Sequence, residues 1–199
     1  MVLPSVSIPD EFSAAAGFYH LLERLWLTEV DTSLLQELQH GSLKTLAAEL
    51  ELPVNDAPQH TLLENLAVAY CQLLVGPANH VPPYQSVWTE GQFQSAATTS
   101  MQAYLDVLGE ATTESSMLDH LGIQFRVMRS ILSELAASDH ESPRHAELHA
   151  MATQFFHDHL TWPGKFLNAA EQATESAFYQ QLVRVTVDFL EQEQHYWSN

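Results

Sequence analysis

The sequence has almost no cysteine. Cys71 is the single one among 199 residues, so no disulfide can form within the chain and nothing indicates an oxidising compartment. Cys71 falls in an apolar helical stretch, where a free thiol is usually a small buried side chain. We therefore expect Cys71 to be buried and to carry no chemistry.

Basic residues are also scarce. Lys and Arg together number 7 against 25 Asp and Glu, which gives a formal net charge of −18. Such a chain is a poor ligand for nucleic acid, whose phosphates are bound by clustered cations, and for an anionic membrane surface. A basic ligand would instead be attracted to it.

Long apolar runs and the common catalytic signatures are missing. No run approaches the roughly 18 residues that a membrane span needs, and the N-terminus has no basic region followed by an apolar one. There is no phosphate-binding loop, no dinucleotide-binding glycine pattern, no nucleophile elbow and no Cys-x-x-Cys pair. We expect a soluble cytoplasmic protein without stable membrane insertion, catalytic residues, metal or cofactor.

Apolar residues recur at helical spacing along nearly the whole chain, and no convincing strand pattern interrupts them. The strongest pattern predicts a central helix over 118–137, covered on two sides. A long proline-rich loop is expected near 76–94 and a polar hinge near 109–117. The fold class is therefore all-α: a single multi-helix bundle over 1–199, with 1–108 and 118–199 as subdomains if the hinge divides it.

Eleven histidines raise the question of a metal site. His145 and His149 stand four residues apart on one predicted helix, a spacing that lets two imidazoles share a metal ion, and Glu141 precedes them by one turn. No motif in the sequence completes a set of three or four ligands. A metal-dependent enzyme or metal carrier remains an alternative to a protein without metal.

The stretch "LLVGPANHVPPYQSVW", residues 73–88, combines three prolines and a Gly-Pro step with two aromatic residues. Prolines make such a segment stiff, and Tyr84, Val87 and Trp88 supply apolar contact area at little entropic cost. The segment suits a preformed wall of a peptide-binding site, or a packing loop that seals the bundle. Asp119 and His120, which open the central helix, suit a helix start.

Three blocks, in this order, resemble the TorD/DmsD/NarJ family of cytoplasmic redox-enzyme maturation chaperones. They are "LLVGPANHVPPYQSVW", then "LDHLGIQFRVM" with its Asp-His pair, then "FFHDHLTWPGKFL", which is similar to the family's His-Leu-x-x-Trp-x-x-x-Phe signature. The sequence departs from the family pattern at Leu74, often Phe, at Gln85, often Glu, and at Leu118, often Pro or acidic. These departures put in doubt which enzyme the protein would bind more than the class of protein to which it belongs.

The resemblance implies an all-α chaperone that binds the twin-arginine signal peptide and the apoenzyme of a molybdopterin-containing oxidoreductase. It implies a monomer with domain-swapped dimers as a minor form. Asp119 would offer a carboxylate to an arginine of the leader, and an adaptor that binds a folded partner is a further alternative. The expected signal-peptide-binding residues, with Tyr84 added for its chemistry, are Leu74, Gly76, Pro77, Pro83, Tyr84, Ser86, Val87, Trp88, Asp119 and His120. The third block adds His159, Trp162 and Phe166, for which binding and structural roles are both open.

Overall fold

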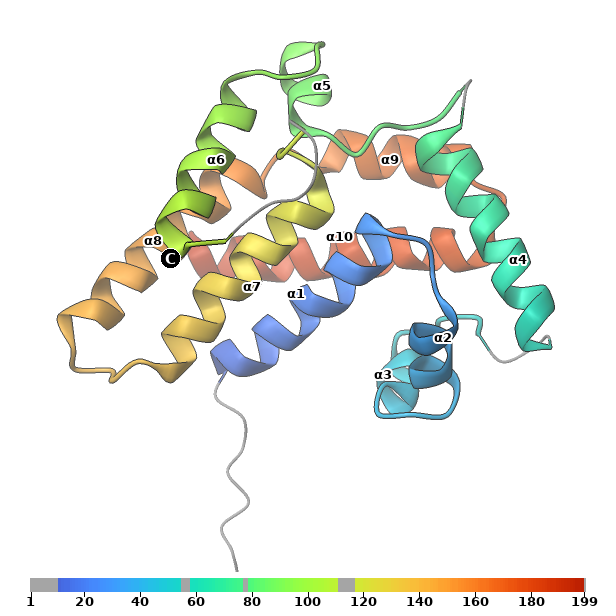
Figure 1. Ribbon diagram of the computed structural model, residues 1–199, viewed down its shortest axis with the longest axis horizontal. Helices are drawn as coiled ribbons and strands as arrows, with labels where there is room; N and C mark the ends of the chain where they lie inside the picture. Colours follow the sequence, from blue (N-terminus) through green and yellow to red (C-terminus); the bar gives the residue numbers. More distant parts are fainter. Residues whose placement is uncertain (1–10, 55–57, 77–78, 111–116, 199) are drawn as a thin grey trace, which may run out of the picture.

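Two helices, α1 (Glu11–Leu27) and α7 (Leu121–Ala137), lie side by side at the centre of the molecule (Figure 1). The computed structural model describes residues 11–54, 58–76, 79–110 and 117–198. Within these ranges the chain is helical and contains no strand, so the all-α prediction is confirmed. The other elements are α2 (Thr32–Gln39), α3 (Lys44–Glu49), α4 (Gln59–Tyr70), the π-helix η1 (Cys71–Val75), α5 (Gln85–Glu90), α6 (Ala96–Leu108), α8 (Pro143–His159), α9 (Gly164–Ala173) and α10 (Ala177–Trp197).

The predicted two-sided burial of the central helix is confirmed. Both apolar stripes of α7 are inside, one of them formed by Ile123, Val127 and Ile131. α1 and α8 pack against α7, and α6 lies beside it. The start of α7 is three residues later than predicted, because Leu118 and Asp119 form a turn and His120, which is extended, caps the helix.

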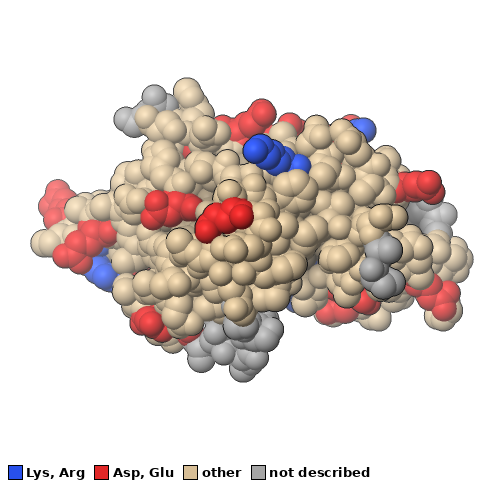
Figure 2. Space-filling model, turned by 90° about the horizontal axis from the view of Figure 1, so that it is seen from above, with Lys and Arg blue, Asp and Glu red and all other residues tan. Residues whose placement is uncertain are grey.

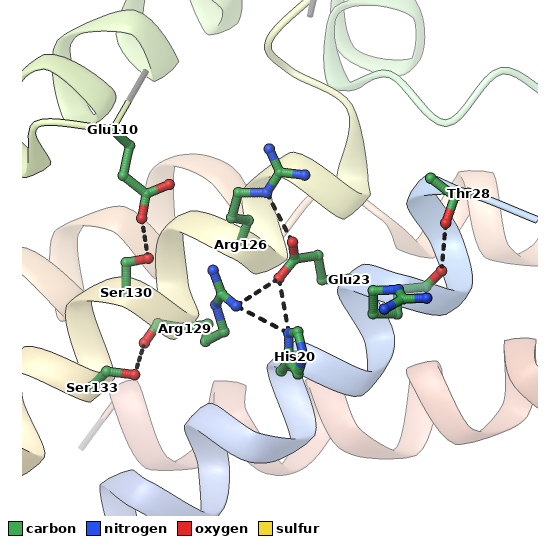
Figure 3. A network of polar contacts seen from close by, with 9 residues as sticks. His20, Glu23, Thr28, Glu110, Arg126, Arg129, Ser130 and Ser133 are labelled. Carbon is green, nitrogen blue, oxygen red and sulfur yellow. Dashed lines mark hydrogen bonds and ion pairs between the residues drawn. The ribbon is translucent and has the colours of Figure 1, made fainter. Parts of the chain in front are cut away.

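Glu23 of α1 forms a buried ionic contact with α7. Its carboxylate accepts a hydrogen bond from Arg126 Nε at 2.8 Å and lies 3.4 Å from Arg129 Nη1, as Figure 3 shows. His20, one turn earlier, lies within 3.3 Å of the same carboxylate. Because only 7% of the Glu23 side chain is exposed, removing either arginine would leave a poorly hydrated charge. The contact therefore fixes the register between α1 and α7.

Gly122 lets the end of α1 approach the start of α7 closely. A Cβ atom placed on Gly122 would lie 2.7 Å from the Cβ atom of Leu27 and 3.0 Å from its backbone nitrogen. Real Cβ atoms do not come that near, so no side chain fits between the two backbones. This contact brings the last residues of α1 close to His120, the N-cap of α7.

Two further sequence expectations need correction. The proline-rich loop predicted over 76–94 contains a helix, α5, because the first N–H groups of this segment, those of Gln85 and Ser86, find acceptors on Asp119. Cys71 is exposed rather than buried, because the chain widens into the π-helix η1 at that position. The predicted hinge near 109–117 lies mostly outside the described residues, as does Pro77.

Candidate functional site

A hollow of about 270 Å³ lies where α1, the π-helix, the proline-rich segment and the start of α7 meet. We call it the junction pocket. Its wall combines apolar groups with the polar groups of two tyrosines and a histidine, which is typical of a site for a mixed apolar and polar ligand. Four residues expected to bind the signal peptide line it: Leu74, Pro83, Tyr84 and His120.

The sequence analysis missed the other residues of the junction pocket. Ile123 carried a signal, since it belongs to the apolar stripe that reaches the start of the central helix. No sequence signal pointed to Leu27 and Thr28, because only the tertiary contact between α1 and Gly122 brings them to the pocket. The lining residues not predicted are Leu27, Thr28, Tyr70, Val75, Met117 and Ile123.

The proline-rich segment is tied to the start of α7 by paired backbone hydrogen bonds. Tyr84 and His120 form an isolated antiparallel bridge. On either side of it, the Gln85 N–H donates to the Asp119 carbonyl at 3.0 Å, and the Leu121 N–H donates to the Pro83 carbonyl at 2.9 Å. Two of the resembling blocks, 30 residues apart in sequence, therefore form one rigid unit.

Asp119 holds this unit together from inside. One carboxylate oxygen accepts the Ser86 N–H at 2.8 Å and the other accepts the Thr98 hydroxyl at 3.0 Å. The residue is 1% exposed, and Ser86 is fully buried beside it. Asp119 thus accepts a backbone N–H at the start of α5 and does not cap α7, whose N-cap is His120. A ligand's guanidinium could reach this buried carboxylate only if the residues that cover it moved.

His120 is a neutral wall residue of the junction pocket. Burial lowers its pKa to about 4, and the nearby Arg126 acts in the same direction, against the opposing effect of Asp119. Its Nδ1 accepts the Gly122 N–H at 3.0 Å. The ring meets the Tyr84 ring edge-on at a centroid distance of 5.1 Å. Burial, aided by Asp119, raises the pKa of Tyr84, so both rings are uncharged at neutral pH.

A buried hydrogen-bond network connects the proline-rich segment and α7 to the end of α8. The Gln85 side-chain oxygen accepts from Gln124 Nε2 at 2.7 Å and from His159 Nδ1 at 2.9 Å. Its amide nitrogen donates to the Asp158 carbonyl at 2.8 Å, and Trp162 Nε1 donates to the Gln124 side-chain oxygen at 2.9 Å. Every member of this network points its polar atoms at another, which makes the arrangement specific.

Two of the three candidate residues of the third block, His159 and Phe166, lie in the interior, and Trp162 is half-buried. His159 is 1% exposed, and burial lowers its pKa to about 4. Since Nδ1 donates to Gln85, its Nε2 accepts from the Ser100 hydroxyl at 2.9 Å. Phe166 is fully buried and packs against Trp162 at a centroid distance of 5.9 Å. Of the two roles left open for His159, Trp162 and Phe166, this placement favours the structural one.

The remaining predicted residues lie next to the junction pocket without lining it. Trp88 is half-buried, donates from Nε1 to the Pro82 carbonyl at 2.7 Å and packs against Phe166. Val87 is half-buried on the same short helix. Gly76 is buried at the end of η1, where its N–H bonds to the Cys71 carbonyl. Trp88 and Asp119 thus belong to one region of the molecule, on either side of Ser86.

Exposed apolar side chains border the junction pocket. Val75 lines it and is 63% exposed, although Leu73 and Leu74 before it are buried. Phe93 is 52% exposed and contacts the Tyr84 ring at a centroid distance of 5.7 Å. Large exposed apolar groups around a hollow are typical of a binding surface.

Carboxylates dominate the electrostatics around the site. Glu29 directly follows the pocket residue Thr28, is exposed, and contributes with burial to raising the pKa of Tyr70 to about 12. It is therefore a carboxylate near the pocket that solvent can reach. On the face seen from above, red acidic side chains are spread over the surface with few blue basic ones among them (Figure 2). A cationic group approaching this surface is attracted from a distance.

The histidines considered as metal ligands make other contacts. His145 lies 2.9 Å from the Ser138 hydroxyl through Nδ1, and its ring packs beside Phe12. His149 packs against Phe12 and Trp197. Among residues 11–54, 58–76, 79–110 and 117–198, no group of three or more His, Cys, Asp and Glu side chains is placed to hold a metal ion. In the same ranges no helix is both long and apolar enough to span a bilayer.

Comparison with known proteins identifies the family. The model of the nitrate reductase delta subunit family matches residues 32–168. The chaperone protein YcdY of Escherichia coli K12 is 27% identical over 126 residues, which cover 63% of this chain and 61% of that protein. The chain thus matches less than two thirds of that relative's length.

A solved structure, of a putative redox enzyme maturation protein from Archaeoglobus fulgidus, has the same fold. Its TM-score is 0.57 at 19% identity, with 95% of this chain and 99% of that one covered. The family match spans all three blocks, and the first two of them contribute six of the residues that line the junction pocket. The chain belongs to the nitrate reductase delta subunit family, the TorD/DmsD/NarJ group of redox-enzyme maturation chaperones that its motifs resemble.

Proposed function

We propose that the protein is a non-enzymatic cytoplasmic chaperone that binds the twin-arginine signal peptide and the apo form of a molybdopterin-containing oxidoreductase. It holds this client until the cofactor is inserted and the enzyme is folded for export. The observation that carries the proposal is the convergence of Leu74, Pro83, Tyr84 and His120 on one pocket. Family membership supports the same function.

The junction pocket suits the apolar part of such a leader. Val75 and Phe93 offer exposed apolar surface at its edge, and the rings of Tyr84 and His120 form a wall without charge. The paired backbone bonds between the proline-rich segment and the start of α7 fix this wall before a ligand arrives. Little conformational entropy is then lost on binding.

We assign the guanidinium partner to Glu29 and a positioning role to Asp119. Glu29 is exposed next to Thr28 of the pocket wall, whereas both oxygens of Asp119 already accept hydrogen bonds inside the protein. A carboxylate that is reached without breaking internal bonds is the better partner for an arginine. Asp119 then contributes by keeping the wall in place.

The direct test is titration calorimetry with leader peptides of the molybdoenzymes from the same organism. Val75→Ser should weaken binding about threefold to tenfold, since it removes apolar contact at the pocket edge. Val107→Ser is the matched control, because Val107 is 64% exposed against 63% for Val75 and lines none of the hollows described here. Absence of heat with every leader at micromolar protein would refute the proposal.

A second pair of variants tests the assignment of Glu29. Glu29→Gln should weaken binding of the leader, and the effect should vanish when the leader's paired arginines are replaced by glutamine. Glu64→Gln, at an exposed position of α4, removes the same charge elsewhere and should change the affinity little. A client that is captured equally well without its leader would instead favour an adaptor for a folded partner.

A further inference from the structure

A second hollow, of about 470 Å³, opens between the first half of α1, the end of α3 and α10. It shares no residue with the junction pocket. Its floor is apolar: the half-buried rings of Phe18 and Phe189 contact each other at a centroid distance of 4.5 Å, beside Leu50 and Val185. The fold leaves two large aromatic faces partly open to solvent here.

Carboxylates form the rim of this hollow. Glu49 and Glu51 lie on one side and Asp188 on the other, and all three residues are exposed. Glu51 has a φ of 53°, in the left-handed region that residues other than glycine rarely adopt. Gln181 fixes this part of the rim, because its side-chain amide donates to the Leu50 carbonyl at 2.9 Å. The acidic groups are thus held at the edge of an apolar floor.

A neighbouring hollow continues the first along α10. It is lined by Asp188, Glu191, Gln192 and His195, so the two share Asp188 and Gln192. From Gln181 to His195 the lining residues follow one side of α10 for about four turns, roughly 20 Å. No Lys or Arg lines either hollow in the part of the chain that the structure describes. We call the combined feature the α10 groove.

We propose that the α10 groove is a docking site for a basic amphipathic helix of a partner protein. The apolar floor of the first hollow takes the apolar face of such a helix, and the carboxylates on the rim and along the polar continuation pair with its lysines and arginines. The length of the groove matches a helix of about 14 residues. The site is separate from the junction pocket and does not depend on the function proposed for it.

Three synthetic peptides of equal length test the site by fluorescence anisotropy. The first has leucines at helical spacing and lysines elsewhere, the second carries glutamates in place of the lysines, and the third carries serines in place of the leucines. We expect the first peptide to bind at micromolar concentration and the other two to bind at least about tenfold more weakly. No binding of the first peptide up to roughly 1 mM, or equal binding of the serine peptide, would overturn the proposal.

Charge variants separate a local site from general attraction to an acidic protein. The triple variant Glu49→Gln, Glu51→Gln, Asp188→Asn should weaken the Leu/Lys peptide about tenfold. The matched control Glu64→Gln, Asp106→Asn, Glu147→Gln loses the same three charges from exposed positions outside the groove, and should change the affinity less than about threefold. An equal loss in both variants would overturn the proposal. A leader peptide should not displace the Leu/Lys peptide, and full competition would also count against a separate site.

Discussion

The carboxylate of Asp119 accepts the backbone N–H of Ser86 at 2.8 Å, across 33 residues of sequence. With the Thr98 hydroxyl on its other oxygen, this buried side chain links the proline-rich segment, α6 and the start of α7. Asp119, which the sequence suggested as the start of α7, therefore stabilises the first turn of α5 instead. The wall of the junction pocket depends on it.

Replacing Asp119 by alanine should lower the free energy of unfolding by about 3 kcal/mol, because the buried Ser86 N–H loses a charged acceptor. Urea unfolding measures this. Asp31→Ala is the control: Asp31 caps α2 by accepting the Leu34 N–H at 2.7 Å, but its side chain is 56% exposed. Its loss should cost only about 1 kcal/mol. Equal effects of the two substitutions would contradict the positioning role of Asp119.

Gly122→Ala should destabilise the protein by about 2 kcal/mol, since the new methyl group would overlap Leu27 and push α1 away from α7. Gly17→Ala, within α1, is the matched control, because nothing lies within 4 Å of its Cβ position. The control should stabilise the protein by about 0.5 kcal/mol, as alanine is the better helix former. Thermal unfolding of both variants separates steric overlap from helix propensity, and a stabilised Gly122→Ala would show that the helices are not in close contact.

Stability should fall as the pH is lowered from about 6.5 to 4. The pKa of His120 and that of His159 are each lowered to about 4 in the folded state from a reference value of 6.5, mainly by burial. The unfolded chain therefore binds protons first, and each group's contribution, about 3 kcal/mol at most, is complete above pH 6.5 and lost toward pH 4.

His159→Gln should flatten this pH dependence, because the variant has no imidazole to protonate at that position. His60→Gln should leave the dependence unchanged, since the His60 side chain is 83% exposed. The measurement is the unfolding free energy from urea titrations at several pH values. A slope for His159→Gln identical to that of the unmodified protein would contradict the burial of His159 as a neutral group.

Cys71 should react with a thiol reagent in the native protein, as it is exposed at the start of η1. We expect complete modification without denaturant, followed by absorbance. A bound leader peptide should slow the reaction, because Leu74 and Val75 of the same short helix line the junction pocket. A scrambled leader is the control, and a thiol that reacts only in denaturant would show that this helix is packed differently.

The monomer with domain-swapped dimers as a minor form remains a prediction. Light scattering across a range of concentrations measures it, and a single mass at the monomer size throughout would count against swapping.

Local patterns predicted the elements of the fold well. The stripes of α7 and the proline at the start of α8 were both visible in the sequence, because helical periodicity and capping act within a few residues. α5 was missed, since the bonds that define it run to Asp119, far along the chain. The burial of His159 follows from a hydrogen-bond network among three elements that no local pattern encodes.

The candidate site was predicted in part for the same reason. Tyr84 and His120 were found through their motifs, and the structure brings them together in one bridge. Leu27 and Thr28 reach the pocket only because Gly122 has no side chain, a contact between residues nearly 100 positions apart. Asp119 is buried because its carboxylate accepts hydrogen bonds from Ser86 and Thr98, which lie in two other segments of the chain.

The π-helix has a consequence for how the pocket edge can vary. A five-residue π turn contains one residue more than regular α geometry would need, so deleting one residue between 71 and 75 can restore an α-helix without breaking it. Because the shortened segment would complete the same turn in regular α geometry, Val75 would keep its place on the rim after the deletion. The chain can thus change its length at this single point without moving the side chain at the pocket edge or disturbing α4 before it.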